Sequence, residues 1–205
     1  MSVVGLSRHT SMFIRRSAPL TKGSTMQPQR TAMFAFLDQV WNRVDRDRIK
    51  EIGPEKAAAE WLIKNGAAVR WKNQAKFVSD YNSMEVTTRP GDTIEAIDAT
   101  EASIMGEGFE YLQGLSSLRM IRFNKTHHIS DGALRKLSYV KDTLEEVEVM
   151  HCGNVTDAGV KSLGQLPKLK NVMLADLIGV KNLEQCAHSI KSDLPECEVQ
   201  VRPTT

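Results

Sequence analysis

Five copies of one apolar pattern constrain the fold of this chain more than any other feature of its sequence. The pattern is apolar-x-x-apolar-x-apolar, and its copies begin at Ile94, Leu118, Leu144, Leu169 and Leu194. The starting positions are 24, 26, 25 and 25 residues apart. A regular period of this length indicates stacked units, because each unit can bury its apolar side chains only against its neighbours.

The segment between two copies recurs as well, and it predicts a helix. Ile129-Ser130-Asp131-Gly132-Ala133-Leu134 is followed 26 residues later by Val155-Thr156-Asp157-Ala158-Gly159-Val160, and Ser, Thr and Asp are preferred at helix N-caps. Each unit is therefore expected to be a strand, a turn and a helix, with a period inside the roughly 20–29 residues of leucine-rich repeats. We predict an α/β fold in which residues 69–205 form a short leucine-rich-repeat solenoid, with a strand near Val69 as an irregular first unit.

Two helices are expected before the repeats. Apolar residues recur at three- and four-residue steps from Met33 to Ile49, which predicts one amphipathic helix. Pro54 suits the first position of a second helix that ends at Lys64, and Asn65-Gly66 provides a left-handed stop. Residues 33–68 should form a small helical domain that caps the solenoid, and the three tryptophans are expected to be buried packing anchors (Trp41, Trp61, Trp71).

Residues 1–32 have the composition of a mitochondrial transit peptide. They contain no acidic residue, nine Ser and Thr residues, and five cations, Arg8, Arg15, Arg16, Lys22 and Arg30. The unbroken apolar core of a secretory signal is absent from them. No stretch of the chain approaches the ~20 apolar residues that span a bilayer, so any membrane association should be peripheral. The net charge of +2 gives no indication of a nucleic-acid partner.

The cysteines and histidines offer the only candidates for chemistry. Cys152 lies near His127, His128 and His151, but the spacing is not a standard zinc pattern and a fourth ligand is not evident. Cys152 occupies a repeat position that favours a small buried polar residue, so a structural thiol is favoured over a metal ligand or a redox thiol. Phosphate-binding, nucleophile-elbow and zinc-protease motifs do not occur, so the chain is not expected to be an enzyme.

Charged side chains alternate with the apolar strand positions and are expected on the concave face of the solenoid. We select Arg119, Arg122, Glu146 and Glu148 as candidate partner-binding residues, because such faces commonly bind other proteins. The alternative is a solvated face with no partner. Reversal of charge at Arg119 and Arg122 is expected to weaken partner binding and to leave the fold unchanged.

Several strings resemble a known family, the mitochondrial ATP synthase subunit s (coupling factor B) family. They are Trp41-Asn42-Arg43-Val44-Asp45-Arg46-Asp47-Arg48-Ile49, Gly53-Pro54-Glu55-Lys56-Ala57-Ala58-Ala59-Glu60-Trp61-Leu62, Ile97-Asp98-Ala99-Thr100 and Cys152-Gly153-Asn154-Val155-Thr156-Asp157. The resemblance extends from about Phe34 to Val201. It implies a non-catalytic protein bound peripherally to the matrix side of the mitochondrial inner membrane, where it associates with the membrane sector of ATP synthase and supports proton-coupled ATP synthesis.

The resemblance also implies a magnesium ion held by the backbone carbonyls of Gly66 and Thr100. Magnesium prefers oxygen ligands and retains several waters, and a helix end near Gly66 offers free carbonyls with partial negative charge. One family feature does not carry over. Mammalian members have a Cys-x-Cys pair where this chain has Asn124 and Thr126, so dithiol regulation is not expected.

Two other functions remain open at this point. Related repeat proteins resemble assembly factors for the membrane arm of respiratory complex I, which makes an assembly factor the main alternative. Leucine-rich repeats also occur in substrate receptors of ubiquitin ligases. Such a receptor needs an adaptor-binding helical module, and the helical stretch from Phe34 to Leu62 is short for that role.

Overall fold

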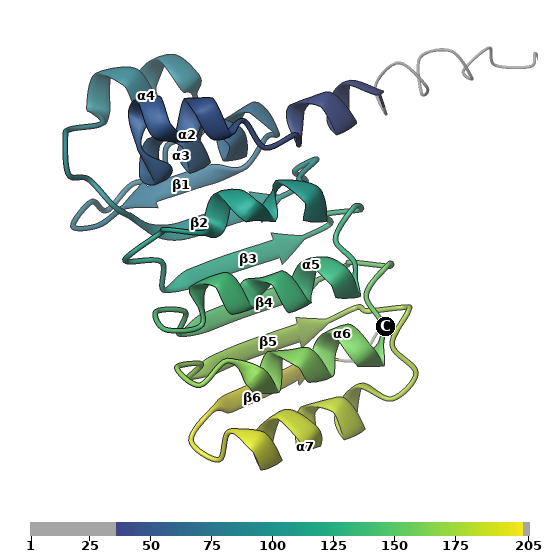
Figure 1. Ribbon diagram of the computed structural model, residues 1–205. Helices are drawn as coiled ribbons and strands as arrows, with labels where there is room; N and C mark the ends of the chain where they lie inside the picture. Colours follow the sequence, from purple (N-terminus) through teal and green to yellow (C-terminus); the bar gives the residue numbers. More distant parts are fainter. Residues whose placement is uncertain (1–35, 203–205) are drawn as a thin grey trace, which may run out of the picture.

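The computed structural model describes residues 36–202, without the side chains of residues 85–87, so the predicted transit peptide lies outside the described residues. One sheet organises this part of the chain, and its strands follow one another in sequence order (Figure 1). The six strands are β1 (Ala68–Trp71), β2 (Ile94–Thr100), β3 (Met120–Asn124), β4 (Glu146–Met150), β5 (Asn171–Ala175) and β6 (Glu198–Arg202).

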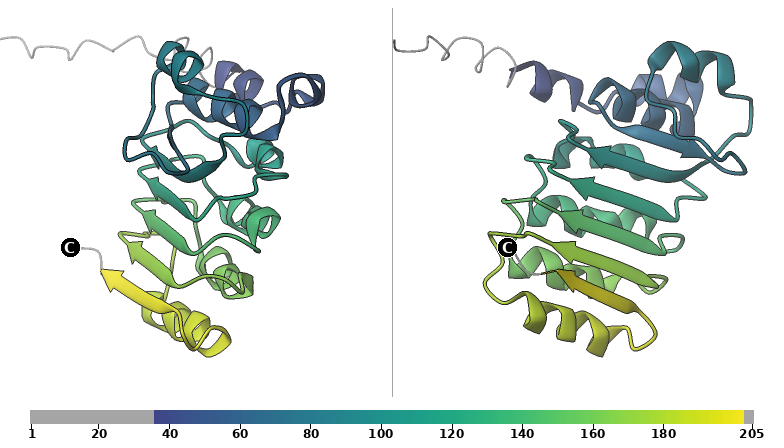
Figure 2. Two further views of the ribbon diagram at one scale, coloured as in Figure 1. Left: turned by 90° about the vertical axis from the view of Figure 1, so that its left-hand side faces the viewer. Right: turned by 180° about the vertical axis from the view of Figure 1, so that it is seen from behind.

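Strands β2 to β6 run parallel, and a helical crossover joins each to the next. The crossovers are η1 (Gly106–Leu112), α5 (Asp131–Arg135) continued by η2 (Lys136–Val140), α6 (Asp157–Ser162) continued by η3 (Leu163–Gln165), and α7 (Leu183–Asp193). Figure 2 shows two layers, with these helices behind one face of the sheet and the other face open. Each repeated unit is thus a strand followed by a helix, which confirms the mixed α/β class.

The strand register matches the apolar pattern in the middle of the chain. Ile121 lies beside Ile97 and Val147, and Val172 lies beside Val147. The last copy of the pattern was predicted two residues too early, because Val199 rather than Cys197 pairs with Val172. The crossover that leads into β6, α7, is an 11-residue α-helix, whereas the two crossovers before it combine α and 3-10 turns. An α-helix rises less per residue, so it needs more residues to span the same length.

The strand near Val69 is not a further copy of the unit. Strand β1 pairs with β2 in the antiparallel direction, with an irregularity between Arg70 and Trp71. The chain then forms α4 (Tyr81–Thr87), which the sequence did not predict, before it enters β2. The repeated strand–helix units therefore begin at Ile94, and β1 closes the N-terminal edge of the sheet.

The prediction of one helix from Met33 to Ile49 is wrong. Residues 36–41 are helical, the chain breaks at 42–45, and α2 (Arg46–Ile52) follows. The break has a local cause, since the Asp45 side chain accepts a hydrogen bond from the Arg48 amide and caps the new helix. The second prediction is confirmed, because α3 spans Pro54–Lys64 and Gly66 follows it with φ 84°.

The N-terminal helices and the sheet share one hydrophobic core. Trp61 of α3 meets Phe109 edge-on at a centroid distance of 6.1 Å, and Phe109 stacks on Phe123 of β3 at 6.0 Å. Trp61 and Trp71 are buried as predicted, but Trp41 is 47% exposed and is not a buried anchor. None of the helices in residues 36–202 is long and apolar enough to cross a membrane.

Candidate functional site

Three of the four residues selected from the sequence, Arg122, Glu146 and Glu148, lie on the open face of the sheet, whereas Arg119 comes immediately before β3. Arg122 and Glu148 bind each other. The Arg122 guanidinium donates two hydrogen bonds to Glu148, at 2.6 and 3.2 Å. Its third contact is Asp98 at 3.0 Å. The register explains this arrangement, because Asp98, Arg122 and Glu148 are direct neighbours on β2, β3 and β4. The hydrogen bonds to Glu148, with the nearby charges, raise the pKa of Arg122 above its usual range.

Arg119 and Glu146 differ from this pair. Arg119 is exposed, Glu146 is half-buried, and within residues 36–202 neither makes an ion pair. Their backbones meet, since the Glu146 amide donates to the Arg119 carbonyl at 2.8 Å. Of the four candidates, Arg122 and Glu148 are therefore bound to each other. The charges of Arg119 and Glu146 are not used in an ion pair within the described residues and are available to a partner.

The turns after the strands form a second regular feature. In four consecutive units the residue that follows the strand is left-handed, with φ between 50° and 57°, and the next residue is buried. In two units this buried residue donates a hydrogen bond to the strand before it: Thr126 Oγ1 to the Ala99 carbonyl, and Cys152 Sγ to the Phe123 carbonyl. Burial raises the pKa of the Cys152 thiol, so little thiolate forms. These contacts support a structural thiol.

The histidines near Cys152 do not gather around it. His151 Nε2 lies 3.0 Å from Asp176, and its Nδ1 lies 3.0 Å from the Asn124 amide oxygen. His128 lies 3.7 Å from Asp38 instead. Among the described residues, His, Cys, Asp and Glu side chains form no group of three that could hold a metal ion.

Thr126 occupies the same position in its unit as Cys152 does in the next unit, so threonine is a suitable substitution with which to test the role of Cys152. We expect Cys152→Thr to preserve the hydrogen bond to the neighbouring strand, and Cys152→Ser to lower the free energy of unfolding by only about 1 kcal/mol. Urea unfolding of both variants, with a binding or functional assay alongside, measures the effect. A Cys152→Ser variant with unchanged stability and abolished function would instead indicate thiol chemistry.

Aspartates at the start of α5 and α6 link each unit to the next. Asp131 accepts hydrogen bonds from the amide and hydroxyl of Thr156, at 2.8 and 2.7 Å. Asp157 accepts from the amides of Lys181 and Asn182, at 3.0 and 3.2 Å. The bond from the Lys181 amide is the main cause that lowers the pKa of Asp157 to about 2. The repeated Ser-Asp and Thr-Asp pairs are the only sequence signal for these links, and by themselves they predict helix caps and not contacts between units.

Because the pKa of Asp157 is lowered, its contribution to the stability of the fold should depend on pH. Its carboxylate stabilises the fold above its ordinary pKa of 3.8, and this contribution is lost as the pH falls towards about 2. The melting temperature of Asp157→Ala should therefore lie below that of the unaltered chain above about pH 4, and the gap should narrow at lower pH. Thermal unfolding between pH 2 and 6 measures it, with the exposed Asp142→Ala as control. A gap that stays constant with pH contradicts the assignment.

The two magnesium positions implied by the resemblance lie near the same end of the β1–β2 pair. Ala68 pairs with Asp98 in the antiparallel direction, Gly66 precedes Ala68 by two residues, and Thr100 follows Asp98 by two. The nearest carboxylate, Asp98, is occupied by the Thr100 amide, the Thr100 hydroxyl and Arg122. Magnesium binding by the Gly66 and Thr100 carbonyls stays a prediction, and an ion held by two neutral carbonyls would retain most of its waters.

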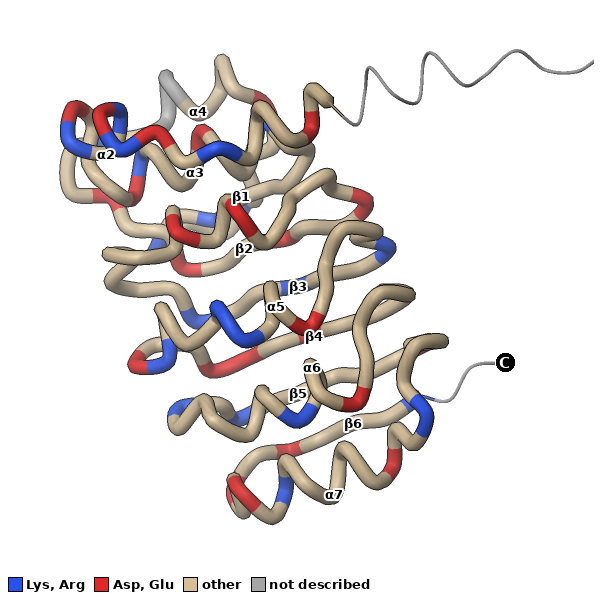
Figure 3. Tube along the Cα trace, turned by 45° about the vertical axis from the view of Figure 1, so that its right-hand side comes forward, with Lys and Arg blue, Asp and Glu red and all other residues tan. Residues whose placement is uncertain are grey.

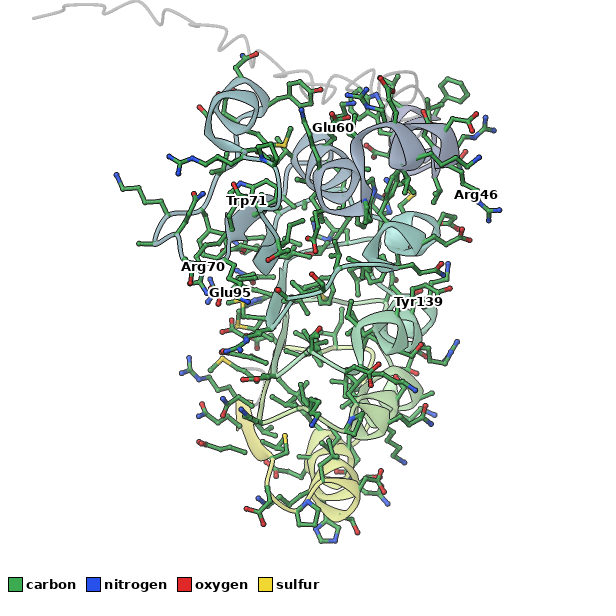
Figure 4. The ribbon with its side chains drawn as sticks, turned by 60° about the vertical axis from the view of Figure 1, so that its left-hand side comes forward. Arg46, Glu60, Arg70, Trp71, Glu95 and Tyr139 are labelled. Carbon is green, nitrogen blue, oxygen red and sulfur yellow. The ribbon has the colours of Figure 1, made fainter. Side chains whose placement is uncertain are left out.

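An apolar surface near the N-terminal end was missed by the sequence analysis. Phe36, Val40 and Trp41 are 63%, 39% and 47% exposed. Val40 and Trp41 border a groove of about 600 Å³ whose wall includes Arg43 and Arg46. Figure 3 shows the acidic and basic residues crowded along α2 beside this segment. In Figure 4, Arg46 points outward on the helical side of the molecule, opposite Arg70 and Glu95 on the sheet side.

Fold and surfaces together define a mixed α/β protein of stacked strand–helix units with one open sheet face. Protein-family models give no match to the chain. Among curated proteins, it is 40% identical over 171 residues to ATP synthase subunit s, mitochondrial, of Bos taurus, which covers 82% of this chain and 86% of the relative. The Homo sapiens protein of that name is 39% identical over 172 residues, with the same coverage. The chain belongs to the family of mitochondrial ATP synthase subunit s.

A more distant relative carries a different name. Distal membrane arm assembly component 2 of Drosophila melanogaster is 26% identical over 157 residues. The match covers 75% of this chain and 55% of that protein.

Proposed function

We propose that this protein is a non-catalytic subunit or regulatory coupling factor of mitochondrial ATP synthase. It docks on the membrane sector from the matrix side and supports proton-coupled ATP synthesis. The observation that carries the proposal is the match to relatives named as a subunit of that complex, at 39–40% identity and over 86% of their length. Residues 1–32, with their basic and acid-free composition, act as the mitochondrial transit peptide in this proposal.

The segment with Phe36, Val40 and Trp41 is the proposed site of peripheral membrane association. Val40 and Trp41 line one groove with basic and acidic side chains (Arg43, Arg46, Arg48 and Lys64; Asp45, Asp47 and Glu60). Exposed aromatic side chains beside charged residues suit the interface of a bilayer. We expect Phe36→Ser with Trp41→Ser to reduce co-sedimentation of the full chain with anionic vesicles by about tenfold.

Tyr139 offers the matched control for that test. It is 38% exposed on the helical side of the molecule (Figure 4), so Tyr139→Ser removes an exposed aromatic residue outside the proposed membrane site. Equal losses from Tyr139→Ser and from the double variant would contradict a specific membrane surface.

Three finer assignments belong to the same proposal. The strand–helix units are leucine-rich repeats, supported by the 24-, 26- and 25-residue steps of the first four copies of the apolar pattern. The open sheet face binds a protein partner through Arg119 and Glu146, with Arg122 and Glu148 holding the surface in shape. Gly66 and Thr100 supply two carbonyls to a weakly bound magnesium ion.

Blue-native electrophoresis of mitochondria that contain the tagged protein tests the function. The proposal expects the protein to migrate with ATP synthase or its membrane-sector intermediates. Migration only with complex I intermediates contradicts the proposal.

The second candidate is an assembly factor for the membrane arm of complex I. The observation that favours it is the 26% identical Drosophila relative named distal membrane arm assembly component 2. The higher identity and coverage of the subunit s relatives favour the first candidate. A ubiquitin-ligase substrate receptor rests on fold analogy alone.

A further inference from the structure

The open sheet face contains two rows of side chains with the same layout, and only one row is complete. The first row crosses β2, β3 and β4 as Asp98, Arg122 and Glu148. The second crosses β4, β5 and β6 as Glu146, Asn171 and Glu198. In both rows two carboxylates flank a central strand and stand two strands apart, roughly 9–10 Å. An arginine occupies the centre of the first row, and an asparagine occupies the centre of the second.

The complete row shows what such an arrangement holds. The Arg122 guanidinium lies between the two acids and binds Glu148 through two of its nitrogens and Asp98 through the third. A planar guanidinium suits this geometry, because its N–H groups form a fixed fork that pairs with carboxylates on both sides. The first row therefore shows that this sheet face can hold an arginine between two acidic side chains.

The incomplete row lacks a cation of its own. Within residues 36–202 Glu146 makes no ion pair, and the Glu198 carboxylate accepts a hydrogen bond only from the Gln200 side chain, at 2.8 Å. The neighbouring Lys170 is paired with Glu145 at 3.0 Å, and Met120 extends the row on β3. A small groove of about 90 Å³ lies over the row, bordered by Glu146, Asn171, Glu198 and residues beside them. Of the three glutamates in its walls, Glu148 is paired with Arg122, whereas Glu146 and Glu198 make no ion pair within residues 36–202 and flank the short Asn171 side chain.

We propose that this groove, over β4 to β6, receives an arginine side chain from a protein partner. The guanidinium enters above Asn171 and bridges Glu146 and Glu198, as Arg122 bridges Asp98 and Glu148. Figure 1 shows β6 and α7 at the opposite end of the stack from α2, so the arginine groove lies away from the apolar N-terminal segment. This inference does not depend on the identity of the complex that the protein joins.

A fluorescent arginine-containing peptide tests the proposal on the full chain. An acetylated peptide with one arginine among glycines and serines, and the same peptide with lysine, serve as probes in polarisation titrations. We expect the arginine peptide to bind more tightly than the lysine peptide. Glu146→Gln with Glu198→Gln should weaken arginine-peptide binding by about tenfold. Glu184→Gln with Glu196→Gln removes the same charge from exposed positions outside the row and should change binding by less than about twofold.

A second kind of variant tests the proposal without removing either carboxylate. Asn171→Arg places a guanidinium in the centre of the row, and we expect it to abolish peptide binding while raising the melting temperature by about 1–3 °C. Three results would overturn the proposal: equal binding of the arginine and lysine peptides, equal losses from the two glutamine double variants, or full peptide binding by Asn171→Arg.

Discussion

Replacement of Asn42 by alanine is expected to lower the free energy of unfolding by about 3–5 kcal/mol. The Asn42 side chain is 1% exposed and joins the N-terminal helices to the loop after β2. Its amide nitrogen lies 2.8–3.0 Å from three oxygens, and its amide oxygen accepts from two nitrogens at 2.7 and 3.1 Å (Asp38 O, Asn65 Oδ1 and Ser103 O; Met105 N and Trp61 Nε1).

The effect should be large because the substitution leaves several buried polar groups without hydrogen-bond partners. Each buried donor or acceptor that loses its partner costs about 1–3 kcal/mol, and several lose theirs at once. Urea unfolding followed by circular dichroism measures the change. Asn154→Ala is the control, because Asn154 is exposed and makes one side-chain hydrogen bond, to the His127 carbonyl. A loss below about 1 kcal/mol for Asn42→Ala, or equal losses for the two variants, contradicts this role.

Arg122→Glu is expected to destabilise the fold by about 2–4 kcal/mol. The substitution places a third carboxylate between Asp98 and Glu148, and the Glu148 side chain is only 11% exposed. The three negative charges would then repel one another without a cation to balance them. The sequence alone predicts that charge reversal at this position leaves the fold unchanged, whereas the ion pairs of Arg122 with Asp98 and Glu148 predict a loss of stability.

Arg119→Glu is the matched comparison. Arg119 is exposed and makes no ion pair in the described part of the chain, so its reversal should change stability by less than about 0.5 kcal/mol. Thermal and urea unfolding of the two variants measure the contrast. Similar stabilities for Arg119→Glu and Arg122→Glu would show that the ion pairs of Arg122 contribute little. Tests of partner binding therefore belong at Arg119 and Glu146.

The positions of β2 to β5 were predictable from the sequence, because burial of alternate side chains fixes which residues of a strand face the core. A shift of one residue would turn Ile121 and Phe123 to the open face, so the apolar pattern determines both register and direction of burial. The same pattern gives no information on strand direction, which is why β1 was assigned to the repeats. It also failed at residues 42–45, where the apolar spacing continues across a break caused by side-chain hydrogen bonds.

The candidate sites were less predictable because they depend on contacts between units. The pairing of Arg122 with Glu148 can be predicted from the sequence if the charged positions of neighbouring units are aligned in the same way as the apolar positions. The exposure of Trp41 does not follow from its type or spacing, since the same pattern describes a buried helix face. The position of Gly66 and Thr100 near the same end of the β1–β2 pair depends on the antiparallel direction of β1, which no local sequence motif predicts.

Crosslinking of the tagged protein in mitochondrial inner membranes, followed by mass spectrometry, tests the central claim most directly. Lys125, Lys141 and Lys170 are exposed at different places along the stack and provide defined attachment points. The proposed function predicts crosslinks from these lysines to membrane-sector subunits of ATP synthase. Crosslinks confined to subunits of the complex I membrane arm would contradict it.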